Sequence, residues 1–150
     1  MHHLDRFNSK ILDQLERNGR ISNTELAEKV GLSTSACFRR VKELEKSGVI
    51  VGYRAQLNRS ALGTGITAFV MVGLSDHRAE HAKKFEQAVA GAREVREVHN
   101  ITGATEYLLR VEAKDLAAFK RFHSEVLGTL PQVHSITSHI CLDSPKDERA

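Results

Sequence analysis

Four polar side chains between residues 34 and 47 recur at the spacing of one helix face and have the chemistry of nucleic-acid contacts. Ser35, Arg39, Lys42 and Lys46 fall on the same side of a helix that turns about 100° per residue. Lysine and arginine bind phosphate, arginine also pairs with guanine edges, and a hydroxyl group binds either. Such a face fits the major groove of DNA.

The opposite side of the same segment is apolar, which predicts that it packs on other helices. Cys37 and Leu44 lie on this side. Arg40 lies at its flank, so we expect the Arg40 stem to pack there while the guanidinium points outward. In an alternative interpretation Arg39 pairs with Glu43, four residues later, and the polar face is only solvated.

Helix start and stop signals place two shorter helices before this one. Asp5 is a favourable N-cap for a first helix that ends near Gly19. Ser22 and Glu25 form a capping box for a second helix that ends at Gly31. Two helices joined by a short turn that contains glycine form a helix-turn-helix, in which the second helix contacts DNA bases.

We therefore predict a DNA-binding surface at the start and on the outer face of the helix over 34–47, with one cation from the segment after it. Residues 49–58 are β-prone and are expected to form a wing or a strand-like arm. The candidate DNA-binding residues are Ser33, Thr34, Ser35, Arg39, Arg40, Lys42, Lys46 and Arg54.

The excess positive charge of the chain is confined to its first part. Residues 1–58 contain 10 Lys or Arg and 7 Asp or Glu, whereas residues 59–150 contain 12 of each, which together give the net charge of +3. Charge segregated in this way favours one domain that binds a polyanion and another with a different role. We predict a DNA-binding domain over 1–58 and a second domain over 59–150.

The composition argues against several other classes of protein. Cys37 and Cys141 have no paired spacing, so we expect reduced thiols and no zinc site. The chain has no phosphate-binding glycine loop either, and we expect no metal and no cofactor. No apolar run approaches the roughly 20 residues of a membrane helix, which favours a cytoplasmic protein without a membrane partner. His2 and His3 are set aside.

The second half of the chain alternates strand and helix patterns in the order βαββαβ. Strands are expected over 66–74, 95–101, 107–113 and 133–142, and helices over 80–90 and 115–130. This is the order of a ferredoxin-like α+β fold, in which two helices cover one face of a four-stranded antiparallel sheet. The strand over 66–74 is apolar on both faces, so we expect a second copy of the chain to cover the open face in a two-fold dimer.

Several segments match one known family in register. In the first domain they are Asn18-Gly19-Arg20-Ile21-Ser22, Glu25-Leu26-Ala27, Val30-Gly31-Leu32-Ser33, Cys37-Phe38-Arg39-Arg40-Val41 and Gly48-Val49-Ile50. In the second they are Gly103 before Tyr107 and Leu130-Pro131 before Val133. With these segments the chain resembles the leucine-responsive/asparagine-regulator (Lrp/AsnC) family of prokaryotic transcription regulators. The resemblance implies a winged helix-turn-helix joined to a ferredoxin-like effector domain, dimers that often assemble into octamers, and regulation by an amino acid.

The resemblance also implies an effector site between subunits, near the loop that joins the two middle strands and the end of the last helix. Glycine and exposed amides in a tight loop bind a carboxylate, and Glu106 is placed to bind an ammonium group. Carried over by position, the candidate effector-binding residues are Asn100, Gly103, Ala104, Thr105, Glu106 and Thr129.

Two alternative functions stay open at this point. Haem-pathway decarboxylase-like enzymes have a similar architecture, and His77 and His81 are spaced to share a metal on a helix. No third ligand, nucleophile motif or carboxylate pair accompanies them, so we predict no catalytic residues. A nonspecific DNA-compacting protein would have the same basic helix but would bind all duplexes alike.

Overall fold

The computed structural model of the chain describes residues 4–147, so His2 and His3 lie outside the described residues. The chain divides into two compact units, one that extends to Gln56 and one that starts at Leu57. This boundary lies two residues before the expected one, which was after residue 58. Each unit has a hydrophobic core of its own. The two units are therefore described separately.

The N-terminal unit consists of three helices, and the caps predicted at Asp5 and Ser22 are present. These helices are α1 (Arg6–Arg17), α2 (Asn23–Val30) and α3 (Thr34–Lys46). The side chains of Asp5, Ser22 and Ser33 each accept a hydrogen bond from a backbone N–H three residues later. In a complete capping box the Glu25 carboxylate would also accept from the backbone N–H of Ser22. Here the carboxylate instead lies 3.0 Å from Lys29 Nζ.

One apolar side chain from each helix lies at the centre of this unit. Ile11 of α1, Leu26 of α2 and Cys37 of α3 are fully buried, and Leu44 extends the contact along α3. Gly31 has a φ of 77°, which lets the chain turn sharply between α2 and α3. The expected helix-turn-helix is therefore present.

Residues 49–58 do not form the expected wing strand among the described residues. Val51 is 95% exposed, and the segment as a whole makes no strand pairing. A β-strand needs a neighbouring strand to satisfy its backbone groups, and the helical unit offers none. A β-prone sequence is thus not sufficient for a strand here.

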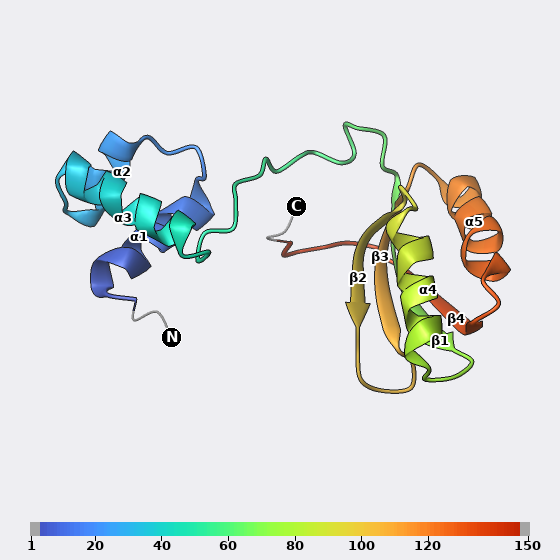
Figure 1. Cartoon of the computed structure of the whole chain (residues 1–150). Helices are drawn as coiled ribbons and strands as arrows, with labels where there is room; N and C mark the ends of the chain where they lie inside the picture. The colour runs from blue at the N-terminus through green and yellow to red at the C-terminus, as the bar shows by residue number, and fades with distance from the viewer. Residues whose placement is uncertain (1–3, 148–150) are drawn as a thin grey trace. The chain divides into compact units, whose positions relative to one another are not determined.

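The C-terminal unit has the predicted βαββαβ order. Its elements are β1 (Ile66–Leu74), α4 (Ala79–Ala90), β2 (Val95–Asn100), β3 (Tyr107–Ala113), α5 (Leu116–Glu125) and β4 (Val133–Ile140). The strands form one antiparallel sheet in the order β2-β3-β1-β4, and both helices lie on the same face of it (Figure 1). This is the ferredoxin-like arrangement.

The last helix is shorter than predicted. It ends at Glu125 instead of continuing to Leu130, and Leu127–Thr129 form a single 3-10 turn. The Thr129 hydroxyl donates to backbone carbonyls one turn earlier, and Gly128 is a poor helix former.

None of the helices within residues 4–147 is long and apolar enough to cross a bilayer.

Two leucines near this helix test the packing. Leu127 is fully buried, whereas Leu116, at the start of the helix, is 63% exposed. We expect Leu127→Ala to lower the free energy of unfolding by about 2 to 5 kcal/mol, because a cavity remains. We expect Leu116→Ala to change it by no more than about 0.5 kcal/mol. Urea unfolding of both variants makes the comparison, and equal losses would contradict this packing.

Candidate nucleic-acid interface and ligand-binding loop

The start of α3 is fixed by polar contacts from two neighbouring segments. The Ser33 hydroxyl caps α3 by accepting from the backbone N–H of Ala36 at 3.3 Å. The side-chain amide of Asn23, at the start of α2, donates to the Thr34 carbonyl at 2.9 Å. Because α3 also buries Cys37 and Leu44, its rotation about its own axis is fixed. The residues on its opposite side must then face outward.

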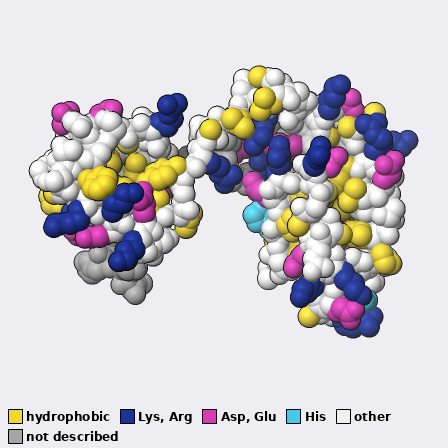
Figure 2. All heavy atoms as spheres, turned by 45° about the horizontal axis from the view of Figure 1, so that its top comes forward, with side chains coloured by type: hydrophobic (Ala, Val, Ile, Leu, Met, Phe, Trp, Pro, Cys, Tyr) yellow, Lys and Arg dark blue, Asp and Glu magenta, His cyan; other side chains and the backbone are white. Residues whose placement is uncertain are grey.

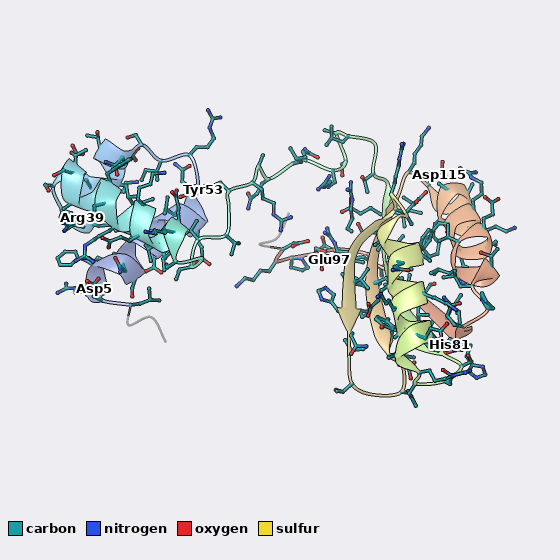
Figure 3. The ribbon with its side chains drawn as sticks, viewed as in Figure 1. Asp5, Arg39, Tyr53, His81, Glu97 and Asp115 are labelled. Atoms are coloured by element: carbon teal, nitrogen blue, oxygen red, sulfur yellow. The ribbon has the colours of Figure 1, made fainter. Side chains whose placement is uncertain are left out.

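The predicted outer face is exposed, and its central cation is unpaired. Ser35, Arg39, Lys42 and Lys46 are all exposed, and Arg39 lies at the surface in Figure 3. The alternative ion pair between Arg39 and Glu43 does not form within the described chain. Neither Arg39 nor Lys46 has a hydrogen bond or ion pair with another described residue. Both cations are therefore available to an external anion.

Lys42 is held by contacts within its own helix. Its Nζ lies 2.8 Å from Glu45 Oε2 and 5.7 Å from the centre of the Phe38 ring. The Tyr53 hydroxyl donates to the other oxygen of Glu45 at 3.1 Å. These hydrogen bonds, the one from Lys42 first, hold the pKa of Glu45 below its ordinary value. Lys42 therefore presents a partly neutralised charge.

Arg40 differs from the expectation, since its guanidinium does not point outward. Its Nη1 donates to Asp5 Oδ2 at 2.7 Å and to Asn8 Oδ1 at 3.0 Å. The guanidinium also lies 5.5 Å from the centre of the Phe7 ring. Arg40 thus joins α3 to the start of α1, and we assign it a positioning role. The sequence did not indicate this, because the partners are more than 30 residues away.

Arg54, the last candidate for this surface, lies in the segment after α3. It is exposed, and no described residue pairs with its guanidinium. The structure shows no element that fixes its direction.

In the C-terminal unit, five of the six candidate effector residues meet in the connection between β2 and β3. The backbone N–H of Ile101 and the side-chain amide of Asn100 both donate to the Glu106 carbonyl, at 2.8 and 3.2 Å. Gly103 and Ala104 are exposed, and Gly103 has a φ of 130°, which favours glycine. The loop is therefore closed at its base and open at its tip.

The carboxylate of Glu106 is engaged within the chain. Its Oε2 accepts from the backbone N–H of Leu74 at 2.8 Å, and its Oε1 lies 3.3 Å from His77 Nδ1. At the neighbouring Gly73 a β-carbon would overlap the Ser135 hydroxyl of β4, so this position needs glycine for the close approach of β4, while Glu106 Oε2 would remain at an ordinary contact distance of 3.7 Å. An ammonium group that bound Glu106 would compete with His77. The sequence does not indicate this contact of His77, because it joins segments almost 30 residues apart.

The hydroxyl of Thr105 is buried without a hydrogen-bond partner among the described residues. A buried polar atom without a partner destabilises a fold unless some other group satisfies it. Beside it, the buried Tyr107 donates to Glu86 Oε1 at 2.7 Å. Burial, and then this hydrogen bond, raise the pKa of Tyr107 to about 12. Tyr107 is thus a neutral anchor for the end of the loop.

Thr129 is not joined to this loop by any hydrogen bond among the described residues. Its hydroxyl donates to the carbonyls of Glu125 and Val126, at 3.1 and 2.9 Å. The observed contacts therefore hold Thr129 in the 3-10 turn that follows α5.

The face of the sheet opposite the helices is partly apolar. Ala68, Val70 and Val72 of β1 point into the core and are fully buried. Their neighbours Phe69 and Met71 lie on the other face and are only half-buried, and the register sets Met71 beside Leu108 of β3, which is also half-buried.

A charged cluster lies on the same open face. Arg110 Nη2 is 3.1 Å from Glu112 Oε1, and their side chains are only 12% and 3% exposed. Arg96 pairs with Glu112 at 3.0 Å, and Arg110 also contacts Glu97 and Asp147 at 3.4 and 3.6 Å. Losing one member of such a buried cluster leaves an uncompensated charge, which is strongly unfavourable.

The histidines considered as metal ligands point to separate carboxylates. His77 contacts Glu106, and His81 Nδ1 lies 3.0 Å from Asp76 Oδ1. Within residues 4–147, no group of three or more His, Cys, Asp or Glu side chains is arranged to hold a metal ion.

Family models match both halves of the chain. The winged helix-turn-helix DNA-binding model matches residues 4–51, and the Lrp/AsnC ligand binding domain model matches residues 67–150. The chain is 42% identical over 144 residues to a leucine-responsive regulatory protein of Rhizobium meliloti, with coverage of 96% of this chain and 92% of the relative. It is 40% identical, with the same coverage, to a proline dehydrogenase transcriptional activator of Rhizobium radiobacter.

Solved structures agree with these matches. A transcriptional regulator from Neisseria meningitidis, in complex with L-Met, has a TM-score of 0.92 and 35% identity, and the match covers 96% of this chain and 93% of that one. An AsnC family transcriptional regulator from Agrobacterium tumefaciens has a TM-score of 0.90 and 33% identity, with coverage of 95% and 93%.

The contact between Asp5 and Arg40 predicts a pH-dependent stability. The backbone N–H of Asn8, and next the Arg40 guanidinium, hold the pKa of Asp5 below its ordinary value of 3.8. Because this pKa is lower in the folded than in the unfolded chain, ionised Asp5 stabilises the fold above about pH 4, and this stabilisation is lost as the pH falls further.

We expect Asp5→Asn, which keeps a favourable N-cap, to lower the free energy of unfolding at pH 7. The difference from the original chain should shrink as the pH approaches 3. Urea unfolding at several pH values measures it, with Asp13→Asn on the exposed side of α1 as the matched control. A difference that stays constant with pH would contradict the contact.

Proposed function

Because the chain belongs to the Lrp/AsnC family of transcription regulators, we propose that it binds specific duplex DNA sequences through α3 and that an amino acid modulates this binding. The observation that carries the DNA-binding part is the exposed face of α3, where Arg39 and Lys46 have no partner among the described residues. The amino-acid part rests on the loop that contains Thr105 and on the ligand-binding domain.

The positions along α3 assign different contacts to these residues. Recognition helices contact base edges with their N-terminal residues. Ser35 and Arg39 lie in this half of α3, so Arg39 contacts a guanine edge and Ser35 a base or phosphate. Lys46 lies in the last turn and contacts phosphate. Backbone N–H groups at Ser33 and Thr34 favour a phosphate at the helix start.

The neighbours Arg39 and Arg40 then have separate roles. Arg39 contacts DNA, whereas Arg40 fixes the orientation of α3 through Asp5 and Asn8. Lys42 and Arg54 add nonspecific affinity.

The loop at Gly103 has the chemistry to bind an amino acid. Its exposed backbone amides bind a carboxylate, and the unpaired hydroxyl of Thr105 gains a partner in the same step. The ammonium group binds Glu106 and displaces His77. The likeness to a regulator in complex with L-Met supports this class of ligand.

The open face of the sheet leaves apolar side chains in contact with water, and a second copy of the chain buries them in a dimer. Met71 and Leu108 offer a half-buried apolar strip, and the cluster around Arg110 and Glu112 lies beside it. A two-fold pair sets like strips against each other and presents two copies of α3 to successive half-sites. Further assembly of dimers into octamers follows the family pattern.

DNA binding is tested by competition. We expect a duplex from the promoter of the protein's own gene to compete at least about tenfold better than random duplex, which is about 1.4 kcal/mol. Arg39→Ala should weaken specific binding by about 1 to 3 kcal/mol, and Lys46→Ala should weaken binding to all duplexes and reduce the salt slope by about one. Equal competition by all duplexes would instead support a DNA-compacting protein.

Effector binding is tested by calorimetry with the twenty amino acids on the full chain. We expect heat from at least one of them, L-Met being the first to test, and a change in DNA affinity at saturation. Thr105→Val, which keeps the shape but removes the hydroxyl, should weaken binding about tenfold because a buried hydrogen bond is lost. Ser75→Ala, which removes an exposed hydroxyl outside the loop, is the matched control. No heat from any amino acid would remove this part of the proposal.

Assembly is tested by sedimentation of the full chain. We expect a dimer or a multiple of it, and we expect Met71→Lys to dissociate the dimer because a charge would be buried in the apolar strip. Leu116→Lys, on α5 on the opposite side of the sheet, should leave the assembly unchanged. A monomer at micromolar concentrations, or dissociation by both variants alike, would contradict a dimer through the open face.

A further inference from the structure

Phe38 is a large aromatic side chain that α3 leaves 54% exposed. The buried apolar residues of α3, Cys37 and Leu44, lie on the other side of the helix. An aromatic ring in water gains free energy when an apolar surface covers it. Figure 2 shows exposed hydrophobic side chains next to Lys and Arg side chains on the N-terminal unit. The position of this ring therefore requires an explanation.

The ring shares a surface with the residues assigned to DNA. Phe38 is roughly 60° around the helix from Ser35 and one turn before Lys42. Lys42 Nζ lies 5.7 Å from the centre of the ring, and Glu45 holds the same ammonium group at 2.8 Å. Phe38 is also in the N-terminal half of α3, which contacts base edges in the major groove.

Of the four bases, thymine alone presents a methyl group in the major groove. The other base edges present donors and acceptors, which an aromatic ring would desolvate without replacing their hydrogen bonds. We propose that Phe38 packs against the 5-methyl group of a thymine in each half-site and so determines the sequence preference at that position. This inference rests on the proposed binding of α3 in the major groove, and it adds a contact that the polar residues do not supply.

The test replaces thymine by deoxyuridine, which lacks only the methyl group. The full chain first enriches its preferred duplex from a random pool, and each thymine of that duplex is then replaced in turn. At one thymine per half-site we expect affinity to fall about fourfold, the value of one buried methyl group. Deoxyuridine elsewhere in the duplex should leave the affinity unchanged.

Variants then connect the methyl group to the ring. Phe38→Ala should bind the thymine and deoxyuridine duplexes equally well, and Phe38→Leu should retain part of the preference. Val51→Ala, which trims another exposed apolar side chain of this unit, is the matched control and should keep the full ratio. Thermal unfolding checks that each variant is folded, and the deoxyuridine series on the unchanged chain needs no variant.

The results separate the two proposals. An enriched duplex in which no thymine responds to deoxyuridine would overturn the contact while leaving the proposed function intact. A Phe38→Ala variant that keeps the fourfold ratio would overturn it as well. If no duplex is enriched, the proposed function and the contact both fail.

Discussion

The packing of one side of α3 on α1 and α2 determines which residues the N-terminal unit presents to a partner. Cys37 and Leu44 are buried, so the helix cannot rotate without exposing them. Arg40 adds a polar constraint, since its guanidinium joins α3 to Asp5 and Asn8. These contacts leave Arg39 exposed and unpaired within the described chain, and the assigned DNA contacts depend on them.

In the C-terminal unit, burial of one face of the sheet likewise determines which residues the other face presents. Two helices bury one face, so the residues of alternate parity must lie on the other. That face combines a half-buried apolar strip with the buried pair of Arg110 and Glu112. At one end of the sheet, Glu106 stabilises the backbone at Leu74 while Thr105 keeps an unpaired hydroxyl. The stability of the fold and the proposed binding of a ligand therefore involve adjacent residues of one loop.

Local signals in the sequence predicted the helices, their caps and the order of strands, because caps and hydrophobic periodicity act over a few residues. Features set by distant contacts could not be predicted in this way. Periodicity alone does not distinguish the exposed Leu116 from the buried Leu127 of the same segment. The inward turn of Arg40 depends on Asp5, 35 residues away. A β-prone run such as 49–58 forms a strand only beside a partner, and an exposed Phe38 cannot be distinguished from a core residue by its type.

The assignment of the outer face of α3 to DNA is tested most directly by cleavage of DNA from a defined position on this helix. Iron–EDTA is attached to a cysteine introduced by Glu43→Cys, an exposed position of α3 beside the outer face that is assigned no DNA contact, in a chain that carries Cys141→Ser so that no other accessible thiol reacts; Cys37 is fully buried. This assignment predicts strong cleavage confined to the enriched site, and little from a chelate at Glu16→Cys on α1. Cleavage that is equal from both positions, or stronger from α1, would contradict the assignment of the outer face of α3 to DNA.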